Sequence, residues 1–193
     1  MTASILLFPS HVVVSNHNYD KDTILNEIYQ EIDKDSIGVK ASNNGGYHSD
    51  YHCLIDNHNI TSLINPIVEY HIKNSFGFKQ GIRWDYDSFW INVNPPHTSN
   101  SPHTHLNCEL SGVFFVNIPN NSGKLRFYNP NTMYSLSAYK SQETMQLTNE
   151  YNCYTWSPTE GDIIIFPNTL QHDVDINMST EDRISIAFNL KLS

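Results

Sequence analysis

Two histidines stand one residue apart in Ser101-Pro102-His103-Thr104-His105, shortly before an apolar segment at residues 110–116. Side chains in a strand alternate between its two faces, so His103 and His105 would point to the same side. Two imidazoles on one side can bind the same metal ion. An isolated His-x-His is more often a pair of ordinary polar residues in a loop, so this interpretation depends on the rest of the chain.

A third histidine follows a short apolar run. Residues 161–167 read Gly-Asp-Ile-Ile-Ile-Phe-Pro, and His172 comes five residues after the proline. An uninterrupted apolar run of this length is typical of a strand that is buried on both faces. Such a strand would hold His172 at the end of a rigid element.

Residues 183–190 alternate between apolar and polar positions, which predicts a strand with one face in the core. The core face consists of Ile184, Ile186, Phe188 and Leu190, and the opposite face begins with Arg183 and Ser185, followed by Ala187 and Asn189. A guanidinium and a hydroxyl two residues apart can bind a carboxylate together if that face lines a cavity.

These segments together resemble the Fe(II)/2-oxoglutarate-dependent oxygenases, and most closely a group of such oxygenases common in marine bacteriophages and bacteria. The resemblance extends over roughly residues 84–190 and agrees in order and spacing. Its motifs are Trp90-Ile-Asn92-Val-Asn94, His103-Thr-His105, Leu110-Ser-Gly112, Gly161 to Pro167 with His172, and Arg183-Ile-Ser185.

The resemblance implies an enzyme that couples oxidative decarboxylation of 2-oxoglutarate, to succinate and carbon dioxide, with hydroxylation of a second substrate by O2. Its Fe(II) would be held by His103, His105 and His172. Arg183 and Ser185 would bind the distal carboxylate of 2-oxoglutarate. The substrate is not identified by the resemblance; a protein side chain such as a prolyl residue, or a small metabolite, is expected. Further residues expected to line the co-substrate cavity are Asn92, Asn94 and Tyr128.

The sequence departs from the family pattern at His105, where most of the superfamily has an acidic residue. Either three histidines hold the metal, or a carboxylate elsewhere completes the site. Glu109 is the nearest candidate, but in a continuous strand it would lie ~13 Å from His105. Asp173 follows His172 directly and would point to the opposite face of a strand.

Two other functions compete with this interpretation. The spacing His103-x-His105-x-x-x-Glu109 also resembles the first metal motif of the cupins, which would use a His/His/Glu/His site without 2-oxoglutarate. The glycine expected later in that motif is missing, since Val116 stands seven residues after Glu109. A cupin has no need of Arg183-x-Ser185. A barrel with a vestigial site is the third possibility.

Composition indicates a globular protein and argues against a polynucleotide substrate. The 193-residue chain has a hydrophobic content of 39% and a formal net charge of −9. Its basic residues are scattered, so phosphate backbones would be repelled. We expect one domain over residues 1–193, with helical and strand support in residues 1–80 and the core with the metal site in residues 81–193.

The three cysteines, Cys53, Cys108 and Cys153, are far apart, which is typical of reduced thiols rather than a disulfide framework. No segment approaches the ~20 apolar residues of a membrane helix, and the apolar run at residues 5–8 lacks the features of a signal peptide. A cytoplasmic protein is expected, in the infected host cell if a phage encodes it. The sequence does not indicate an oligomeric state.

The elements predicted around these residues are two helices followed by many short strands. Apolar stripes predict helices at residues 20–33 and 60–76, the second with Pro66 in its first turns. Strands are predicted at residues 5–8 and 12–14 before the helices, and at 89–93, 112–118, 124–128, 151–156, 162–166 and 183–190 after them. We therefore predict a mainly β protein, a double-stranded β-helix (jelly roll) braced by two N-terminal helices.

Two segments leave their roles open. Residues 47–52 contain His48 and His52 among aromatic residues, and a loop is favoured over a second metal site because no strand pattern supports them. Residues 129–150 form a long irregular connection, which is either a functional lid or binding loop or a disordered insertion.

Overall fold

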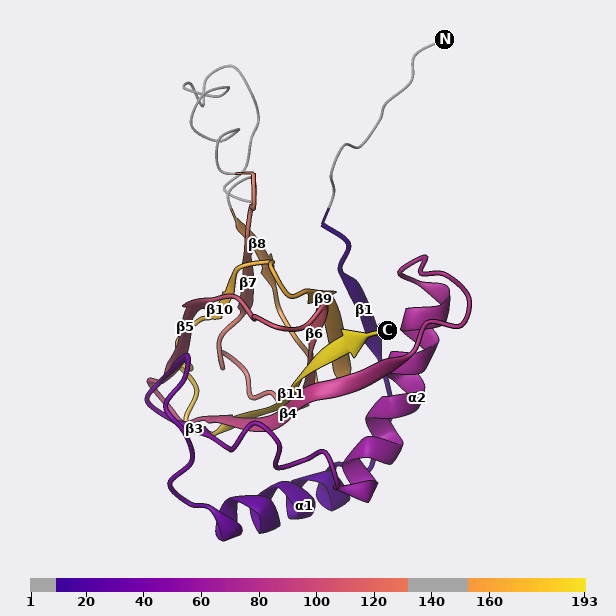
Figure 1. The fold of residues 1–193 in the computed structure, drawn as a ribbon. Helices are drawn as coiled ribbons and strands as arrows, with labels where there is room; N and C mark the ends of the chain where they lie inside the picture. Colours follow the sequence, from indigo (N-terminus) through magenta and orange to yellow (C-terminus); the bar gives the residue numbers. More distant parts are fainter. Residues whose placement is uncertain (1–9, 132–152) are drawn as a thin grey trace, which may run out of the picture.

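The computed structural model describes residues 10–131 and 153–193, and it contains two antiparallel sheets with two helices beside one of them (Figure 1). The first sheet has the order β1-β9-β6-β11-β4-β3, and the second has the order β2-β5-β10-β7-β8. The strands of the first sheet are β1 (Val13–Asn16), β9 (Asp162–Pro167), β6 (Leu110–Asn117), β11 (Arg183–Leu192), β4 (Trp84–Asn94) and β3 (Tyr47–His48). Those of the second are β2 (Asn43–Asn44), β5 (Ser99–His103), β10 (His172–Val174), β7 (Leu125–Tyr128) and β8 (Cys153–Trp156).

From β4 to β11 the chain passes repeatedly between the two sheets, and the neighbouring strands are antiparallel. This arrangement is a double-stranded β-helix, or jelly roll, and it confirms the predicted fold class. The strand predicted at residues 5–8 lies outside the described residues, as does most of the connection at 129–150.

Two apolar cores hold the layers together. The larger core joins the helices α1 (Lys21–Lys34) and α2 (His58–Asn74) to the outer face of the first sheet. Its fully buried members include Ile28, Ile64, Phe89, Phe114 and Phe188. The smaller core lies between the two sheets and consists of Phe115, Leu125, Phe127, Ile164, Phe166, Leu170 and Val174.

The helices begin at side-chain caps that satisfy free backbone N–H groups. The Asp20 carboxylate accepts from the N–H of Thr23 at 3.2 Å, and the Asn57 side chain accepts from the N–H of Ile60 at 3.1 Å. Because α2 begins at His58, Pro66 is the ninth residue of the helix, in its third turn, and not in the first turns as expected. The Ser62 carbonyl therefore lacks the usual hydrogen bond from an N–H four residues later.

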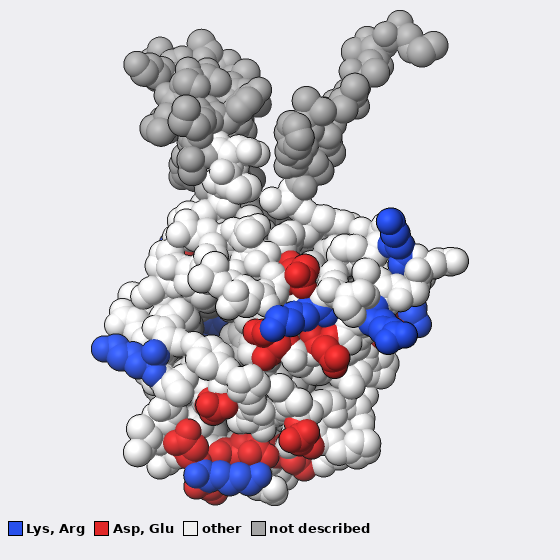
Figure 2. Space-filling view, in the orientation of Figure 1, with Lys and Arg blue, Asp and Glu red and all other residues white. Residues whose placement is uncertain are grey.

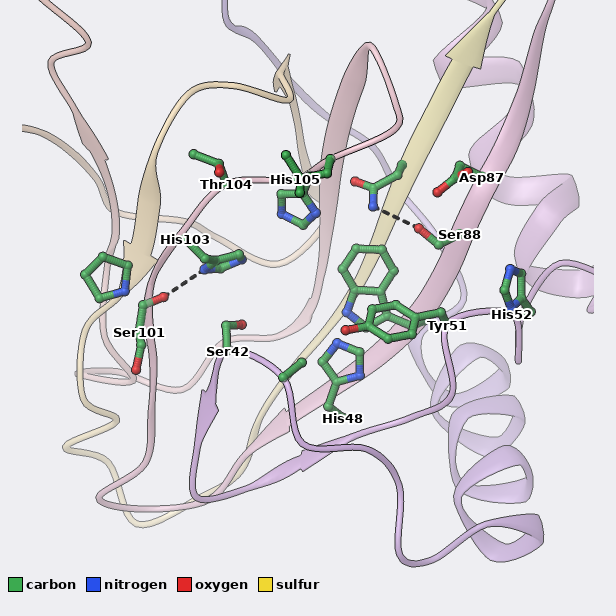
Figure 3. Close-up of a pocket in the computed structure, with 15 residues that line it drawn as sticks. Ser42, His48, Tyr51, His52, Asp87, Ser88, Ser101, His103, Thr104 and His105 are labelled. Atoms are coloured by element: carbon green, nitrogen blue, oxygen red, sulfur yellow. Dashed lines mark hydrogen bonds between the residues drawn. The ribbon is translucent and has the colours of Figure 1, made fainter.

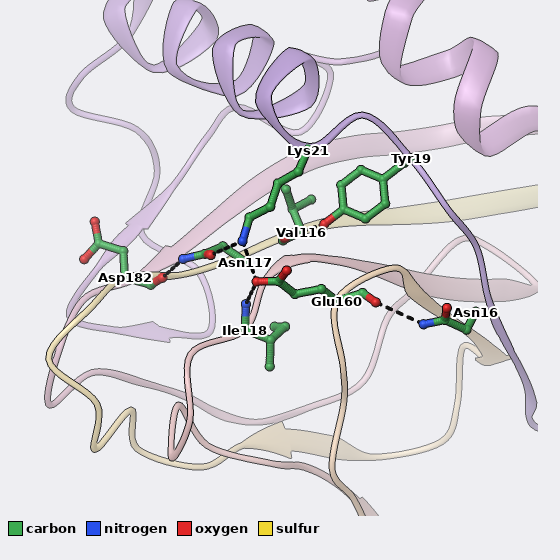
Figure 4. Close-up of polar contacts among 8 residues, drawn as sticks. All are labelled: Asn16, Tyr19, Lys21, Val116, Asn117, Ile118, Glu160 and Asp182. Carbon is green, nitrogen blue, oxygen red and sulfur yellow. Dashed lines mark hydrogen bonds and ion pairs between the residues drawn. The ribbon is translucent and has the colours of Figure 1, made fainter.

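Polar contacts fix the start of α1 to the end of the barrel (Figure 4). The Lys21 ammonium contacts the Glu160 carboxylate and donates to Asn117 Oδ1 at 2.7 Å. Tyr19 donates its hydroxyl hydrogen to the Val116 carbonyl at 2.6 Å. These contacts connect the N-terminal segment to β6 and to the turn before β9.

The largest difference from the predicted elements concerns the two histidines at 103 and 105. They were expected to enter the strand that continues into residues 110–116, but His103 is the last residue of β5, and His105 lies in the loop that leads to β6. β5 and β6 belong to different sheets. The polar sequence Ser-Asn-Ser-Pro-His gives β5 no apolar alternation by which it could be recognised.

The charged residues that can be seen on the described surface are mixed in sign. On the face shown in Figure 2, Lys and Arg are interspersed with Asp and Glu and form no continuous basic surface. This agrees with the scattered basic residues of the sequence and the net charge of −9.

Candidate metal centre

Three histidines meet where β5 ends and β10 begins, beside the loop that follows β5. His172 opens β10 and lies directly opposite His103 in the antiparallel register of the two strands. Asn168 fixes the backbone of His105 from both sides: the His105 N–H donates to the Asn168 carbonyl at 3.0 Å, and Asn168 Nδ2 donates to the His105 carbonyl at 3.1 Å. The strand register and this backbone clamp therefore bring the three side chains together.

One nitrogen from each of the three rings lies within 4.8 Å of the other two, which is close enough for the rings to share a metal ion. The Nε2 atoms of His105 and His172 are 3.3 Å apart, and the ring centroids of His103 and His172 are separated by 4.4 Å. Neutral imidazole nitrogens are suitable ligands for Fe(II). The three nitrogens predicted to bind the metal are thus clustered.

Backbone carbonyls determine how two of the rings are protonated. His103 Nδ1–H donates to the Ser101 carbonyl at 2.7 Å, and His172 Nδ1–H donates to the Leu170 carbonyl at 2.9 Å. A carbonyl can only accept, so both rings carry their hydrogen on Nδ1 and keep a lone pair on Nε2. The His105 ring has no such anchor within the described residues.

Burial keeps the histidines neutral. Loss of solvent, followed by repulsion from the neighbouring imidazoles, lowers the pKa of His105 to about 3. Burial, followed by the charge of His103, lowers the pKa of His172 to about 4, and burial also lowers the pKa of His103. At neutral pH the lone pairs are therefore free to bind a metal.

A narrow cavity of about 40 Å³ runs from the three histidines into the space between the sheets, and we call it the inner cavity. Arg183 and Ser185 of β11 line it, as does Asn92 on the neighbouring strand β4. The alternation of residues 183–190 is as predicted, because Ile184, Ile186, Phe188 and Leu190 lie in the larger core.

Among the described residues that line the inner cavity, Arg183 is the charged one. Only 2% of its surface is exposed, and its side chain lies over the Phe115 ring. Within the described residues, Nε and Nη1 have no hydrogen-bond partner. Burial lowers the pKa of Arg183 to about 10, so the guanidinium is still charged at pH 7.

The other candidate residues lie in different surroundings. Asn94 pairs with Arg183 across the strands but is not among the residues lining the cavity; its Nδ2 donates to Asn100 Oδ1 at 3.1 Å. The expected position of Tyr128 in the cavity is wrong. Leu125 and Phe127 of its short strand pack inward, so Tyr128 faces outward and donates its hydroxyl hydrogen to Asp173.

Neither acidic residue near the histidines reaches the metal site. Asp173 is held on the far side of β10 by a bidentate ion pair with Arg126, at 2.8 and 2.7 Å. Glu109 is exposed, and its carboxylate accepts from the N–H of Leu192 at 2.9 Å. Of the residues described, the group that could hold a metal is therefore His103, His105 and His172, and the cupin-like site with Glu109 has no geometric support.

A second, open pocket of about 730 Å³ lies on the other side of the histidines, and we call it the outer pocket (Figure 3). Ser42, Trp90, His103 and His105 line both spaces. His48 and Tyr51 also line the outer pocket, although residues 47–52 were expected to be an ordinary loop. The local sequence gave little sign of this, because β3 is only two residues long and is defined by its pairing with β4.

Comparison with known proteins decides the family. A family model described as "Putative 2OG-Fe(II) oxygenase" matches residues 88–189, more than half of the chain. The chain belongs to the 2-oxoglutarate/Fe(II) oxygenases. As a dioxygenase of this family it uses Fe(II), 2-oxoglutarate and O2. The curated proteins include no match to this oxygenase.

Solved structures share the fold of this oxygenase at low sequence identity. The Pseudomonas putida prolyl-4-hydroxylase aligns with a TM-score of 0.62 at 13% identity, over 93% of this chain and 92% of that chain. The viral collagen prolyl hydroxylase of Paramecium Bursaria Chlorella virus-1 gives 0.61 at 10% identity, over 93% and 94%. The carbocyclase SnoK from nogalamycin biosynthesis gives 0.65 at 11% identity, over 94% and 79%.

The residues present fit the cofactors of the family. Three neutral imidazoles form a donor set for Fe(II), and a buried guanidinium with unpartnered N–H groups fits a carboxylate. The described helices include none that is both long and apolar enough to cross a membrane.

Proposed function

We propose that this oxygenase holds Fe(II) with His103, His105 and His172, binds the distal carboxylate of 2-oxoglutarate with Arg183 and Ser185, and hydroxylates a protein side chain of the prolyl type or a small metabolite. One oxygen atom of O2 enters the product and the other enters succinate, with release of carbon dioxide. The observation that carries this proposal is the buried, unpartnered guanidinium of Arg183 in a cavity that also reaches the three histidines.

A buried cation without a hydrogen-bonded counter-ion is unfavourable, because it has lost its hydration and the nearby Asp175, which pairs with Arg126, offsets this only in part. A carboxylate that enters the inner cavity would supply that charge and accept from the free Nε–H and Nη1–H groups. The volume of about 40 Å³ has room for roughly three water molecules, which suits a carboxylate group. The 2-oxo acid end of the co-substrate would then extend toward the histidines.

The bound iron, 2-oxoglutarate and O2 supply the oxidising chemistry. The residues of this chain orient the reactants and exclude water. The Ser101 and Leu170 carbonyls hold His103 and His172 with Nε2 free for the metal. Arg183 and Ser185 fix the far end of the co-substrate, so its oxo acid group has one orientation. Phe166 and Val174 give the inner cavity an apolar lining.

Three observations support the proposed substrate class. Prolyl-4-hydroxylase and viral collagen prolyl hydroxylase share the fold over more than nine-tenths of both chains. SnoK, which also shares the fold, is a carbocyclase from nogalamycin biosynthesis, and so it supports a small metabolite as the alternative. The net charge of −9 disfavours a polynucleotide.

The test is co-substrate binding under anaerobic conditions. Fe(II) with 2-oxoglutarate should give the weak visible absorption band of a chelate between the metal and a 2-oxo acid. A 2-oxo acid without the distal carboxylate should bind roughly a hundredfold more weakly, because a fork of two charged hydrogen bonds is lost. The Arg183→Ala variant should weaken 2-oxoglutarate strongly and the truncated acid hardly at all.

The matched control is Arg83→Ala, because Arg83 is exposed and directly precedes Trp84, which pairs with Leu192 at the opposite end of β11 from Arg183. This control should bind both acids as the wild-type chain does. If Arg183→Ala weakened the binding of both acids equally, Arg183 would not bind the distal carboxylate. Absence of the absorption band in the wild-type chain would contradict the proposed function.

A further inference from the structure

Three rings form a wall of the outer pocket that the proposed metal and co-substrate sites do not use. The rings of His48 and Trp90 are stacked, with centroids 5.5 Å apart and an interplanar angle of 14°. The Tyr51 ring stands edge-on to both, at 5.0 Å from His48 and 5.7 Å from Trp90. We call these three residues the aromatic wall.

The aromatic wall and the histidines His103 and His105 line the same outer pocket. Figure 3 shows His48 and Tyr51 across the pocket from His103 and Thr104. The Trp90 ring is 5.8 Å from the His105 ring, and Trp90 also lines the inner cavity. A substrate bound beside the metal centre would therefore contact Trp90 and its two neighbours.

His48 offers this pocket a hydrogen-bond acceptor. Its Nδ1–H donates to the Ser49 carbonyl at 2.6 Å, so Nε2 carries a lone pair. Within the described residues Nε2 has no partner, and His48 lines the pocket. Burial lowers the pKa of His48, which keeps the ring neutral and Nε2 an acceptor at pH 7.

Apart from the proposed Fe(II) and its co-substrate, the described lining of the outer pocket lacks groups that would bind an anion strongly. No Lys or Arg is among the described residues that line it. Asp87 lines the rim and is held by Lys191 at 2.5 Å, so this pair has no net charge. A carboxylate or phosphate that entered would lose hydration without gaining a counter-charge from the wall.

We propose that the primary substrate presents to the aromatic wall a group without negative charge, with a flat apolar face and an N–H or O–H donor that His48 Nε2 accepts. This inference rests on the proposed function for its location beside the metal. Tyr51 and Trp90 select the flat face, and His48 selects the donor. His48 and Tyr51 lie outside residues 88–189, so this specificity is added to the part matched by the family model.

The test uses three small probes that share one ring: benzamide, N,N-dimethylbenzamide and benzoate. Binding to the full chain with Fe(II) and 2-oxoglutarate is measured anaerobically by equilibrium dialysis, so that the co-substrate occupies Arg183. Benzamide should bind about fivefold more tightly than its dimethyl form, which has no donor, and at least about tenfold more tightly than benzoate. Benzoate binding as tightly as benzamide would overturn the proposal.

Variants of single residues then distinguish what His48 and Tyr51 each contribute to the binding of the probes. His48→Phe keeps a ring against Trp90 and removes the acceptor, so benzamide and its dimethyl form should bind equally. Tyr51→Ala should weaken both amides severalfold, whereas the control Tyr70→Ala, on an exposed tyrosine of α2, should change neither. An unchanged benzamide preference in His48→Phe, or equal effects of the two tyrosine variants, would contradict the assigned roles.

The chelate band in the same samples distinguishes the two proposals. If the band forms and the probes show no preference, the aromatic wall proposal fails while the proposed function stands. If no band forms, the proposed function fails, and the same three probes with the metal-free chain still decide whether the wall selects a neutral donor.

Discussion

His103 and His172 differ from His105 in how their rings are held. Both anchored rings donate Nδ1–H to a backbone carbonyl, whereas the His105 ring packs against Trp90 without such a bond in the described chain. Hydrogen bonds of this kind orient a ligand and raise its basicity. At the scale of single residues, the three proposed ligands are therefore not equivalent.

Removing an anchored ligand and exchanging His105 for another kind of ligand should affect metal binding to different extents. His103→Ala and His172→Ala should each weaken Fe(II) binding by about a hundredfold or more, because an oriented ligand is lost. His105→Asp should retain Fe(II) within about tenfold, since two histidines and one carboxylate form a well-known Fe(II) site. Competition with a chelator measures all three affinities. Unchanged Fe(II) affinity in His103→Ala and His172→Ala would mean that the metal is bound elsewhere.

The lowered pKa values of the histidines predict how the metal-free chain responds to acid. The unfolded chain protonates His105 and His172 near the ordinary value of 6.5, but the folded chain does so only near about 3 and about 4. Between these limits the unfolded state binds more protons, so the free energy of unfolding falls as the pH falls, by up to about 1.4 kcal/mol per pH unit for each histidine.

Urea unfolding at several pH values between 6.5 and 4 measures this slope. The His105→Phe variant removes one of the two groups and should show a shallower slope than the wild-type chain. Parallel curves for the two proteins would show that His105 protonates equally in both states.

At the scale of elements, Gly112 of β6 makes room for an aromatic ring on the neighbouring strand. Gly112 lies opposite Phe188 in the register of β6 and β11, and a Cβ atom there would come within 2.2 Å of the Phe188 ring. The ring is fully buried in the larger core, so it cannot move away without disturbing its neighbours. The two positions are therefore coupled.

The Gly112→Ala variant should lose about 1–3 kcal/mol of unfolding free energy through overpacking. In the double variant Gly112→Ala/Phe188→Leu, the smaller side chain should recover part of the loss, so the two effects should not add. Urea midpoints at constant m-value measure both. A midpoint of Gly112→Ala equal to that of the wild-type chain would contradict the coupling.

The elements also show where sequence reasoning succeeds and where it stops. Strong alternation placed Arg183 and Ser185 on the cavity face correctly, because the opposite face consists of large apolar residues. The outward direction of Tyr128 was also readable, since it shares its face with Arg126 and not with Leu125 or Phe127. The roles of Arg183 and Ser185 in binding the co-substrate remain predictions.

Other elements depend on pairing that no local pattern reveals. β5 contains Pro102 and no apolar alternation, yet it forms because β10 pairs along one side of it. The register of β5 and β10 shifts between the pairs His103–His172 and Asn100–Val174, so Pro102 lies at an irregularity, where a strand tolerates a residue without an N–H. A similar pairing, of β3 with β4, places His48 at the outer pocket.

At the scale of the whole molecule, we propose that residues 1–193 form one domain. The helices of the N-terminal half share the larger core with β4, β6, β9 and β11, and Lys21 contacts Glu160 across the chain. One shared core should unfold in one step.

Two probes of unfolding should therefore give the same midpoint. Far-UV circular dichroism reports the helices, and tryptophan fluorescence reports the strands that carry Trp84, Trp90 and Trp156. The Lys21→Met variant should lower both midpoints together. Two separate transitions would divide the chain into two units.

The position of the aromatic wall has a consequence for how such an enzyme changes during evolution. His48 and Tyr51 belong to the connection between α1 and α2, and Trp90 supports them from β4. Mutations in that connection can reshape the surface that meets a new substrate, while the proposed metal ligands and Arg183 lie on other elements of the chain. Selection for a new substrate can thus act on a short segment of the chain without repeatedly risking the loss of its chemistry.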